Sequence, residues 1–399
     1  MREIAVEPWG AVESLLLAAG DRAEGLAETI RGIGLEQVTD VVVDELVVRC
    51  EVPAVDAPVV LQLELSDGRA LAGRGLTIDG AAMSAVPGWV GDAVATVRFD
   101  VVDAVASLFD PSGRARQVSR DVTWLENSQK VMLTDGRPDV HAMLPHWQQL
   151  NRVVQAVVAA CTARPSDLGE LSVRFGSDKW ASLHWYTQHY EQHFARFRTE
   201  PVRLLEIGIG GYQFADRGGE SLRMWQRYFS RGLIYGLDIF DKPGVTGPRI
   251  RAVQGDQNDP EFLAELGRRC GPFDIIIDDG SHVNEHVKTS FRCLFPFVRL
   301  GGLYVVEDAQ TAYWPGYGGD DRDLINADTS IGMLKSLVDG LNHKEIPLGV
   351  DSPSYTDRHV VGLHFYHNLA IVEKGVNSED SAPSFIPREY SGGAVGMSP

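Results

Sequence analysis

The sequence has little of what a disulfide scaffold, a thiolate zinc site or a membrane protein needs. Its 399 residues include only four cysteines, at positions 50, 161, 270 and 293, and no two of them form a C-x-x-C pair. This spacing indicates neither a disulfide framework nor a zinc ribbon. No apolar run approaches the roughly 18 residues of a membrane span. The N-terminus also lacks the basic-then-apolar pattern of a signal peptide, so we expect a cytoplasmic protein.

Basic residues are also in short supply. The chain has 37 Lys and Arg against 55 Asp and Glu, which gives a formal net charge of -18. A nucleic-acid-binding protein or a protein of anionic membrane surfaces needs a basic footprint. The charge balance therefore argues against both partners and suits a small, neutral or cationic substrate.

The length and a hydrophobic content of 44% allow two domains with cores of their own. Residues 10 to 33 have helical spacing, residues 38 to 66 are rich in β-branched residues, and residues 94 to 109 alternate loosely. These patterns predict a small α+β domain over residues 1–160, ending with a helix over 141–161. A break at Pro165-Ser166-Asp167 marks the expected linker to a second domain, residues 161–399. No catalytic spacing occurs in the first part, so we assign it an auxiliary role in oligomerisation or in covering a site.

The second part alternates between apolar strands and helices. Strands are expected at 202–207, 232–238, 250–256, 274–279 and 302–308, and helices at 221–230, 260–269 and 285–297. Such alternation predicts an α/β fold, with a mostly parallel, doubly wound, Rossmann-like sheet. Two further strands, 360–366 and 369–374, are joined by His367-Asn368. They predict an antiparallel C-terminal hairpin at the end of this sheet.

The first of these strands runs into the pattern E-x-G-x-G-G, which includes Glu206, Gly208 and Gly210, and the second ends at Asp238. Glycines there let a ligand approach the backbone, and a carboxylate at Asp238 can accept both hydroxyls of a ribose. The adjacent second and third glycines, followed by a loop that begins at Tyr212, do not suit a pyrophosphate on a helix N-terminus. S-adenosylmethionine fits this pattern better than a dinucleotide.

The third strand ends in Gly255-Asp256-Gln257, which could hold the adenine edge of such a cofactor. Asp256 could instead cap the helix that begins at Pro260, and the sequence leaves both alternatives open.

The fourth strand ends in Asp278-Asp279-Gly280-Ser281-His282. Four interpretations compete for this stretch: a plain strand edge, the rim of a nucleotide pocket, a metal-and-base site, and, with Glu285 and His286, an H-x-x-E-H zinc motif.

The chain from about residue 170 resembles class I S-adenosylmethionine methyltransferases, and within them the metal-dependent sugar O-methyltransferases of macrolide biosynthesis, of the mycinamicin and tylosin type. The stretches that carry the resemblance are 205–212, 277–282, 306–308, 175–179 and 365–368. The resemblance implies a Mg²⁺ ion, the 2-hydroxyl of a macrolide-linked 6-deoxyallose as methyl acceptor, and a homo-oligomer, which we expect to be a tetramer. It also implies that the region around Ser177 helps to cover the cofactor.

The strands that end at Asp279 and at Glu307-Asp308 are neighbours in the methyltransferase order, so their carboxylates should converge. Converging carboxylates repel each other, and a hard cation such as Mg²⁺ relieves the repulsion. We therefore predict Asp279 and Asp308 as metal ligands and Glu307 as a third, with a solvated strand edge as the alternative. Asp278 is expected to support the site from the cofactor side.

His282 lies three residues past Asp279, where a helix is expected to begin. Methyl transfer to an alcohol needs in-line positioning and removal of the hydroxyl proton. A metal on adjacent sugar oxygens would lower the pKa of the hydroxyl, and a neutral imidazole could then take the proton. His282 is the predicted general base. The aromatic and glycine-rich stretch 310–342 is expected to recognise substrate or form a lid, with ordinary loop packing as the alternative.

Three other functions stay open from the sequence. A catechol-type O-methyltransferase shares the metal site but usually lacks so long a leading domain. An NAD-dependent oxidoreductase and a non-catalytic nucleoside-binding protein are the candidates from other classes. The paired carboxylates at two strand ends argue against simple binding.

Overall fold

The computed structural model describes residues 9–20, 23–111, 120–128, 133–134, 137–138, 140–160, 167–181, 184–346 and 352–388. The chain divides into two compact units, Met1–Asp256 and Gln257–Pro399. The linker expected near Pro165-Ser166 lies outside the described residues, and the domain boundary at residue 160 stays a prediction. Within the described residues, no helix combines the length and apolar character of a membrane span.

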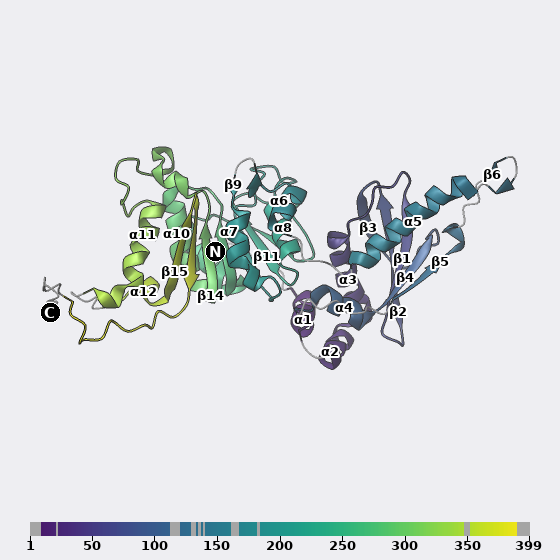
Figure 1. The fold of residues 1–399 in the computed structure, drawn as a ribbon, viewed down its shortest axis with the longest axis horizontal. Helices are drawn as coiled ribbons and strands as arrows, with labels where there is room; N and C mark the ends of the chain where they lie inside the picture. Colours follow the sequence, from purple (N-terminus) through teal and green to yellow (C-terminus); the bar gives the residue numbers. More distant parts are fainter. Residues whose placement is uncertain are drawn as a thin grey trace, which may run out of the picture. The chain divides into compact units, whose positions relative to one another are not determined.

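The N-terminal part contains a five-stranded sheet with the strand order β3-β2-β1-β4-β5 (Figure 1). The strands pair in antiparallel fashion except β1 and β4, which are parallel. Helices α3 and α5 both contact β1. The bounds of these elements are α1 Ala11–Ala18, α2 Ala23–Ile33, α3 Leu35–Arg49, β1 Val59–Ser66, β2 Leu71–Asp79, β3 Ala82–Pro87, β4 Ala95–Asp100, α4 Val101–Phe109, β5 Arg120–Trp124 and α5 Val140–Ala160.

The expectation of strand-like structure from residue 38 is wrong for residues 38 to 49, which form helix α3. The buried side chains Val38, Val42 and Leu46 recur every four residues, which places them on one face of a helix. The β-branched residues of this stretch favour a strand. Secondary-structure propensity is a weak prior, however, and tertiary packing overrides it here. The expected helix 10–33 is two helices, α1 and α2.

A second difference concerns the loose alternation at 94–109. Strand β4 ends at Asp100, and helix α4 begins at the next residue. The Asp100 carboxylate accepts hydrogen bonds from the backbone N–H of Val102 at 2.9 Å and of Asp103 at 3.0 Å. This N-cap satisfies amides that a helix start leaves unpaired, and it fixes the change from strand to helix.

A buried ion-pair cluster ties α3 to the start of β12 within the first unit. Glu45 accepts two hydrogen bonds from Arg249, at 2.9 and 2.8 Å, and one from Arg49 at 2.5 Å. Arg249 also donates to three backbone carbonyls, those of Gln226, Phe229 and Gly232. Burial alone would raise the pKa of Glu45, but the charges of Arg249 and Arg49 lower it to about 2.

We expect Glu45→Gln to lower the free energy of unfolding by about 3–5 kcal/mol at pH 7, because it leaves buried guanidinium groups without their counter-charge. The folded-state pKa of Glu45 lies below its ordinary value of 4.5. The stabilisation is therefore complete above pH 4.5 and is lost as the pH falls toward 2. Urea unfolding at pH 7 and pH 3.5 checks this. The exposed Glu28→Gln is the control, and equal midpoints for the two variants at pH 7 would contradict the account.

The larger sheet has seven strands in the order β12-β11-β10-β13-β14-β16-β15 (Figure 1). The first three in that order lie in the first unit and pair in parallel. In the second unit β13 and β14 are parallel, and β16 is antiparallel to both β14 and β15. The expected parallel sheet and the hairpin turning at His367-Asn368 are confirmed. The bounds are β10 Arg203–Ile207, β11 Leu233–Asp238, β12 Ile250–Gln254, β13 Phe273–Asp278, β14 Val298–Val306, β15 Val360–Tyr366 and β16 Leu369–Lys374.

The strands of this sheet are nearly continuous apolar runs because parallel sheets are covered on both faces. In β13, Ile275, Ile276 and Ile277 are fully buried. The helices from residue 168 onward are α6 Leu168–Phe175, α7 Thr187–Phe194, α8 Glu220–Tyr228, α9 Pro260–Cys270, α10 Asn284–Leu294, α11 Ser330–Leu341 and α12 Tyr355–His359. Two short strands, β8 Trp180–Ala181 and β9 His184–Trp185, lie between α6 and α7 in the chain.

Candidate active site

The glycine-rich turn after β10 is held in a tight loop. Gly208 donates its N–H to the carbonyl of Leu237 at 2.7 Å, and Gly219 donates to that of Ile209 at 2.7 Å. Gly211 has φ +70°, and a Cβ there would lie 2.4 Å from the backbone of Arg217. Only glycine fits at that position. The turn therefore doubles back on itself before α8 begins at Glu220, and it is not a straight entry into a helix.

Asp238 closes this turn from the end of β11. One carboxylate oxygen accepts the N–H of Ile209 at 3.0 Å, and the other accepts the N–H of Phe240 at 2.9 Å. A carboxylate offers about four lone-pair sites, so both oxygens can accept further hydrogen bonds. The structure thus places Asp238 beside Gly208 and Gly210 in one loop cluster, with Tyr212 exposed at its edge. This arrangement fits a nucleoside whose ribose hydroxyls donate to the carboxylate.

Glu206 is fully buried at the end of β10. Its Oε2 accepts hydrogen bonds from Trp225 Nε1 at 3.0 Å and Ser221 Oγ at 2.9 Å, and its Oε1 lies 3.3 Å from Lys179 Nζ. A buried carboxylate with three such partners fixes α8 and the segment around Lys179 to the strand. Ser177, also buried, accepts the N–H of Lys179 on its Oγ at 3.4 Å. Cofactor contacts by Glu206 and Ser177 stay predictions.

Gln257 links the two sides of the loop that follows β13. Its Nε2 donates to Asp278 at 3.1 Å, and its Oε1 accepts the N–H of Ser281 at 2.6 Å. Asp259, rather than Asp256, is the N-cap of α9, because its carboxylate accepts the N–H groups of Glu261 and Phe262. Asp256 is exposed and does not cap α9, so the capping alternative for Asp256 is wrong. Its proposed contact with adenine stays a prediction.

Asp278 is 1% exposed and supports the loop from inside the protein. Its carboxylate accepts hydrogen bonds from Gln257, Ser290 and Tyr304. Burial raises the pKa of Asp278 to about 6, although the hydrogen bonds from Ser290 and Gln257 and the nearby His282 oppose the rise. The side chain is committed to fixing the loop between β13 and α10.

Three ligand-type side chains converge beyond the ends of β13 and β14. Atoms of Asp279, His282 and Asp308 all lie within 4.8 Å of one another, and His282 Nε2 is 3.5 Å from Asp308 Oδ2. An oxygen of Glu307 also lies within 4.8 Å of one of Asp279. The predicted convergence of the strand-end residues is therefore present in the structure. Oxygen ligands at this spacing, with an adjacent imidazole, suit a hard divalent cation such as Mg²⁺.

Two members of this cluster hold a strained backbone. His282 has φ +57° and Asp308 has φ +49°, both in the left-handed region that non-glycine residues rarely adopt. The surroundings impose these conformations: Ala309 N–H donates to Asn368 O at 3.0 Å, and Glu307 N–H donates to Asp278 O at 3.0 Å. Strain of this kind clusters at functional sites, where it aims side chains.

Asn284, buried at the start of α10, connects the cluster to the aromatic stretch beyond β14. Its Nδ2 donates to the carbonyls of Thr311 at 3.1 Å and Tyr317 at 3.0 Å, and its Oδ1 accepts the N–H of Ser330 at 2.6 Å. Trp314 and Tyr317 remain partly exposed, with ring centroids 5.8 Å apart. No local pattern in the sequence predicts this role, because the partners of Asn284 lie up to 46 residues away.

The H-x-x-E-H alternative does not find support in the arrangement of its residues. His286 Nδ1 lies 2.8 Å from Ser281 Oγ, and the exposed Glu285 forms an ion pair with the buried Lys288. Among the described residues, the clusters with metal-ligand spacing include His282 but neither His286 nor Glu285.

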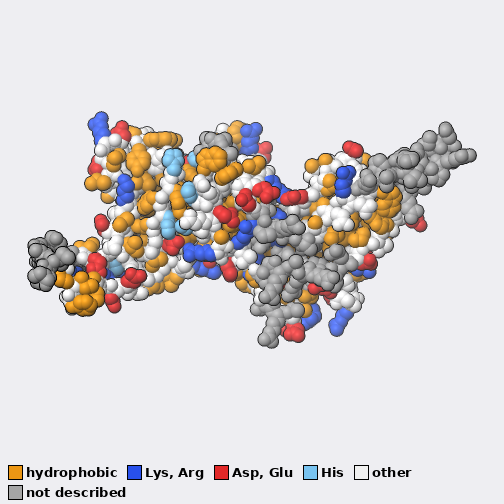
Figure 2. Space-filling view, in the orientation of Figure 1, with side chains coloured by type: hydrophobic (Ala, Val, Ile, Leu, Met, Phe, Trp, Pro, Cys, Tyr) orange, Lys and Arg blue, Asp and Glu red, His pale blue; other side chains and the backbone are white. Residues whose placement is uncertain are grey.

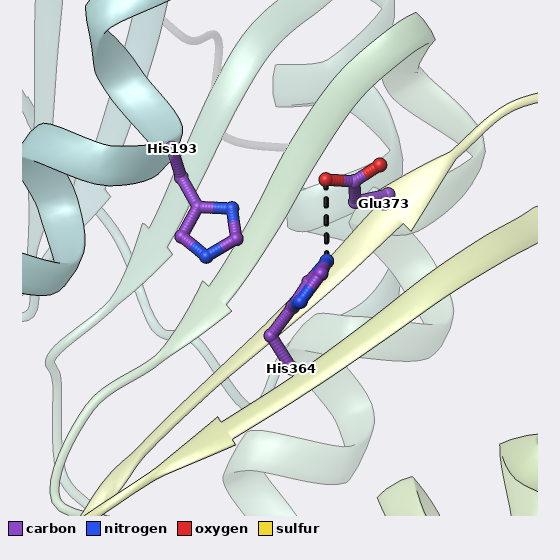
Figure 3. Close-up of side chains that lie close together, drawn as sticks. All are labelled: His193, His364 and Glu373. Carbon is purple, nitrogen blue, oxygen red and sulfur yellow. Dashed lines mark ion pairs between the residues drawn. The ribbon is translucent and has the colours of Figure 1, made fainter.

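A polar pair on the C-terminal hairpin also went unpredicted. His364 on β15 and Glu373 on β16 form an ion pair, with Nε2 and Oε1 3.3 Å apart (Figure 3). The two strands are antiparallel neighbours, so the pair follows from their register.

On the face drawn in Figure 2, basic side chains lie scattered among acidic and hydrophobic ones.

The strand order and the site together define a class I methyltransferase. The last strand, β16, lies between β14 and β15, so that one antiparallel strand is inserted into an otherwise parallel order. The glycine turn follows β10, Asp238 ends β11, and the carboxylate cluster follows β13 and β14.

Comparisons with known proteins narrow this class. Residues 12–120 match the family described as MycE methyltransferase N-terminal. The chain is 48% identical to demethylmacrocin O-methyltransferase of Streptomyces fradiae over 394 residues, which cover 96% of this chain and 98% of the relative. It is 42% identical to mycinamicin VI 2″-O-methyltransferase of Micromonospora griseorubida, over 96% of this chain and 97% of the relative.

A solved structure of the MycE methyltransferase in complex with Mg, SAH and mycinamycin VI has a TM-score of 0.85 and 41% identity, over 96% of this chain and 98% of that one. This chain belongs to the MycE-type family of S-adenosylmethionine-dependent sugar O-methyltransferases. The resemblance drawn from residues 205–212, 277–282 and 306–308 is confirmed at the level of the family.

Proposed function

We propose that this protein transfers the methyl group of S-adenosylmethionine to a deoxysugar hydroxyl of a macrolide precursor, in a Mg²⁺-dependent reaction. The convergence of Asp279, His282 and Asp308 at the strand ends carries the proposal. The solved relative holds Mg, SAH and a macrolide together. We further propose the 2-hydroxyl of 6-deoxyallose as the acceptor, which the 2″-specific relative supports.

The residues of the site would divide the work as follows. Asp238 and the glycine turn hold the nucleoside end of the cofactor, while Gln257 and Asp278 keep the loop 279–282 in place. Asp279 and Asp308, with Glu307, would hold the Mg²⁺ ion. When bound, the ion supplies a Lewis acid that lowers the pKa of an adjacent hydroxyl, and S-adenosylmethionine supplies the methyl group.

His282 would accept the proton of the attacking hydroxyl on Nε2. Asp308 lies 3.5 Å from that nitrogen, and a nearby carboxylate stabilises an imidazolium as it forms. The left-handed backbone of His282 aims the ring toward the carboxylates. The protein then needs only to align the sugar oxygen behind the methyl group, because methyl transfer requires little covalent help.

Methyl transfer from labelled S-adenosylmethionine to a panel of desmethyl macrolides tests the proposal. We expect label in the macrolide, and NMR of the product should place it on O-2 of the deoxysugar. A relative of 41% identity is named for a 3′-hydroxyl of a rhamnosyl tetracenomycin, so label at O-3 would overturn the position and leave the class of reaction intact. Label on catechols alone would favour the small-molecule alternative. Nicotinamide binding with no methyl transfer would favour an oxidoreductase.

We also propose that the chain assembles as a homotetramer, as the resemblance implies. Sedimentation equilibrium should then give about four times the chain mass of 43.8 kDa, and a monomer mass would reject the proposal.

A further inference from the structure

A pocket of about 260 Å³ lies in the second unit, and two of its lining residues, Ala309 and Gln310, directly follow Asp308 in the chain. Its walls come from the segment after Asp308, from α11 and from the turn of the C-terminal hairpin. The larger side chains that line it are those of Gln310, Tyr313, Lys335, Phe365, Tyr366 and Asn368. Gln310, Tyr313 and Lys335 belong to the stretch 310–342 that the sequence predicts to recognise substrate or form a lid, whereas none of the predicted catalytic, cofactor or metal residues lines the pocket.

The pocket is fixed to the proposed metal site through the backbone. Gln310 follows Asp308 by two residues, and Ala309 N–H donates to Asn368 O at 3.0 Å, which joins the two walls. A ligand group in the pocket would therefore be attached to, or adjacent to, the group that lies at Asp308.

The lining indicates what such a group must be. Gln310 Oε1 is buried and has no hydrogen-bond partner among the residues that the structure describes. A buried acceptor left unpaired costs about 1–3 kcal/mol, so it favours a ligand that donates a hydrogen bond. Tyr313 and Phe365 are 39% and 43% exposed and offer apolar faces.

The charge of the lining excludes one class of ligand. Among the described residues that line the pocket there is no carboxylate. The one charged side chain among them is Lys335, whose Nζ lies 6.0 Å from the Tyr313 ring centroid and donates to Leu324 O at 2.8 Å. A cationic amino sugar would meet a like charge with no counter-charge. The volume is also below the roughly 300–1,000 Å³ of pockets for drug-sized ligands, which suits one ring.

From this geometry we infer that the pocket binds one neutral, hydroxyl-bearing ring of the substrate, next to the sugar that is methylated, with Gln310 Oε1 accepting a hydroxyl. The inference rests on the proposed function and adds a determinant of specificity to it. Gln310 would act in substrate binding and would leave the chemical step unchanged.

The test compares Gln310→Met with the wild-type enzyme on two acceptors. One is a desmethyl macrolide with a neutral ring beside the acceptor sugar, and the other is the acceptor sugar as a simple methyl glycoside. Loss of one hydrogen bond is expected to raise KM for the macrolide about 3–10-fold, with kcat unchanged and KM for the simple glycoside unchanged. Gln37→Met, on the exposed side of α3, is the matched control.

Phe365→Ala is a second pocket variant, in case Gln310→Met fails to fold. The Phe365 side chain is partly exposed, so its loss should leave the fold intact, and it should also raise KM for the macrolide. An unchanged KM for the macrolide in both variants would overturn the inference, as would tighter binding of an acceptor that carries an ammonium group on the adjacent ring. If the wild-type enzyme methylates neither acceptor, the proposed function fails instead. The wild-type measurement thus separates the two failures.

Discussion

Replacing His282 by Asn should lower kcat by about 10²–10⁴-fold, which is the range of general acid–base catalysis. Asn tolerates the left-handed conformation that position 282 requires at φ +57°. The substitution therefore removes the basic nitrogen and keeps the loop. Initial rates of methyl transfer at saturating macrolide and cofactor measure the effect.

The same variant distinguishes a general base from a metal ligand. His282 could be either, because its ring nitrogen lies within 4.8 Å of carboxylate oxygens of Asp279 and Asp308. As a base, His282 can be lost without a change in the Mg²⁺ concentration that gives half-maximal rate. A large rise in that concentration would instead assign His282 to the metal. His286→Asn is the matched control, because its ring contacts Ser281. Wild-type turnover in His282→Asn would remove His282 from the mechanism.

Replacing Asp308 by Asn should lower turnover about 10³-fold at limiting Mg²⁺, because a bound metal contributes several kcal/mol to such a reaction and each 1.36 kcal/mol is tenfold. Asn again suits the left-handed backbone, here at φ +49°. The change removes one charge from the carboxylate cluster. We expect titration calorimetry to show weakened Mg²⁺ binding and excess Mg²⁺ to restore part of the rate.

The control for this variant is Asp339→Asn, on the exposed side of α11, which should behave as wild type. Cofactor binding provides a second check. The residues proposed to hold S-adenosylmethionine do not include Asp308, so the affinity for this cofactor should change little. Unaltered Mg²⁺ binding in Asp308→Asn would contradict the assignment of this carboxylate.

The sequence was most informative where burial dictates a simple pattern. The strands at 203–207, 233–238 and 273–278 were predicted to within about one residue because a covered parallel sheet requires unbroken apolar runs. The turn at His367-Asn368 was predicted from its two flanking runs. In α3 the same kind of residues formed a helix, since helix and strand cannot be separated by β-branched content alone.

The part of the site that could be predicted from the sequence is the part at the ends of neighbouring strands, because the sheet order of the fold brings those strand ends together. Asp279 and Asp308 could be brought together on that basis, 29 positions apart in the chain. The supporting contacts could not. Gln257 bridges Asp278 and Ser281, and Asn284 joins segments that no local periodicity connects. The left-handed backbone at two non-glycine positions and the unpaired Gln310 oxygen arise only from tertiary packing.

The proposed chemistry places one metal-dependent site at the ends of β13 and β14, where it methylates a sugar hydroxyl. Transfer of labelled methyl to a desmethyl macrolide, before chelation, in excess EDTA and after Mg²⁺ is returned, tests it most directly. We expect turnover to disappear in EDTA and to recover with Mg²⁺, while bound S-adenosylmethionine remains detectable throughout. Turnover at the full rate in EDTA would contradict it.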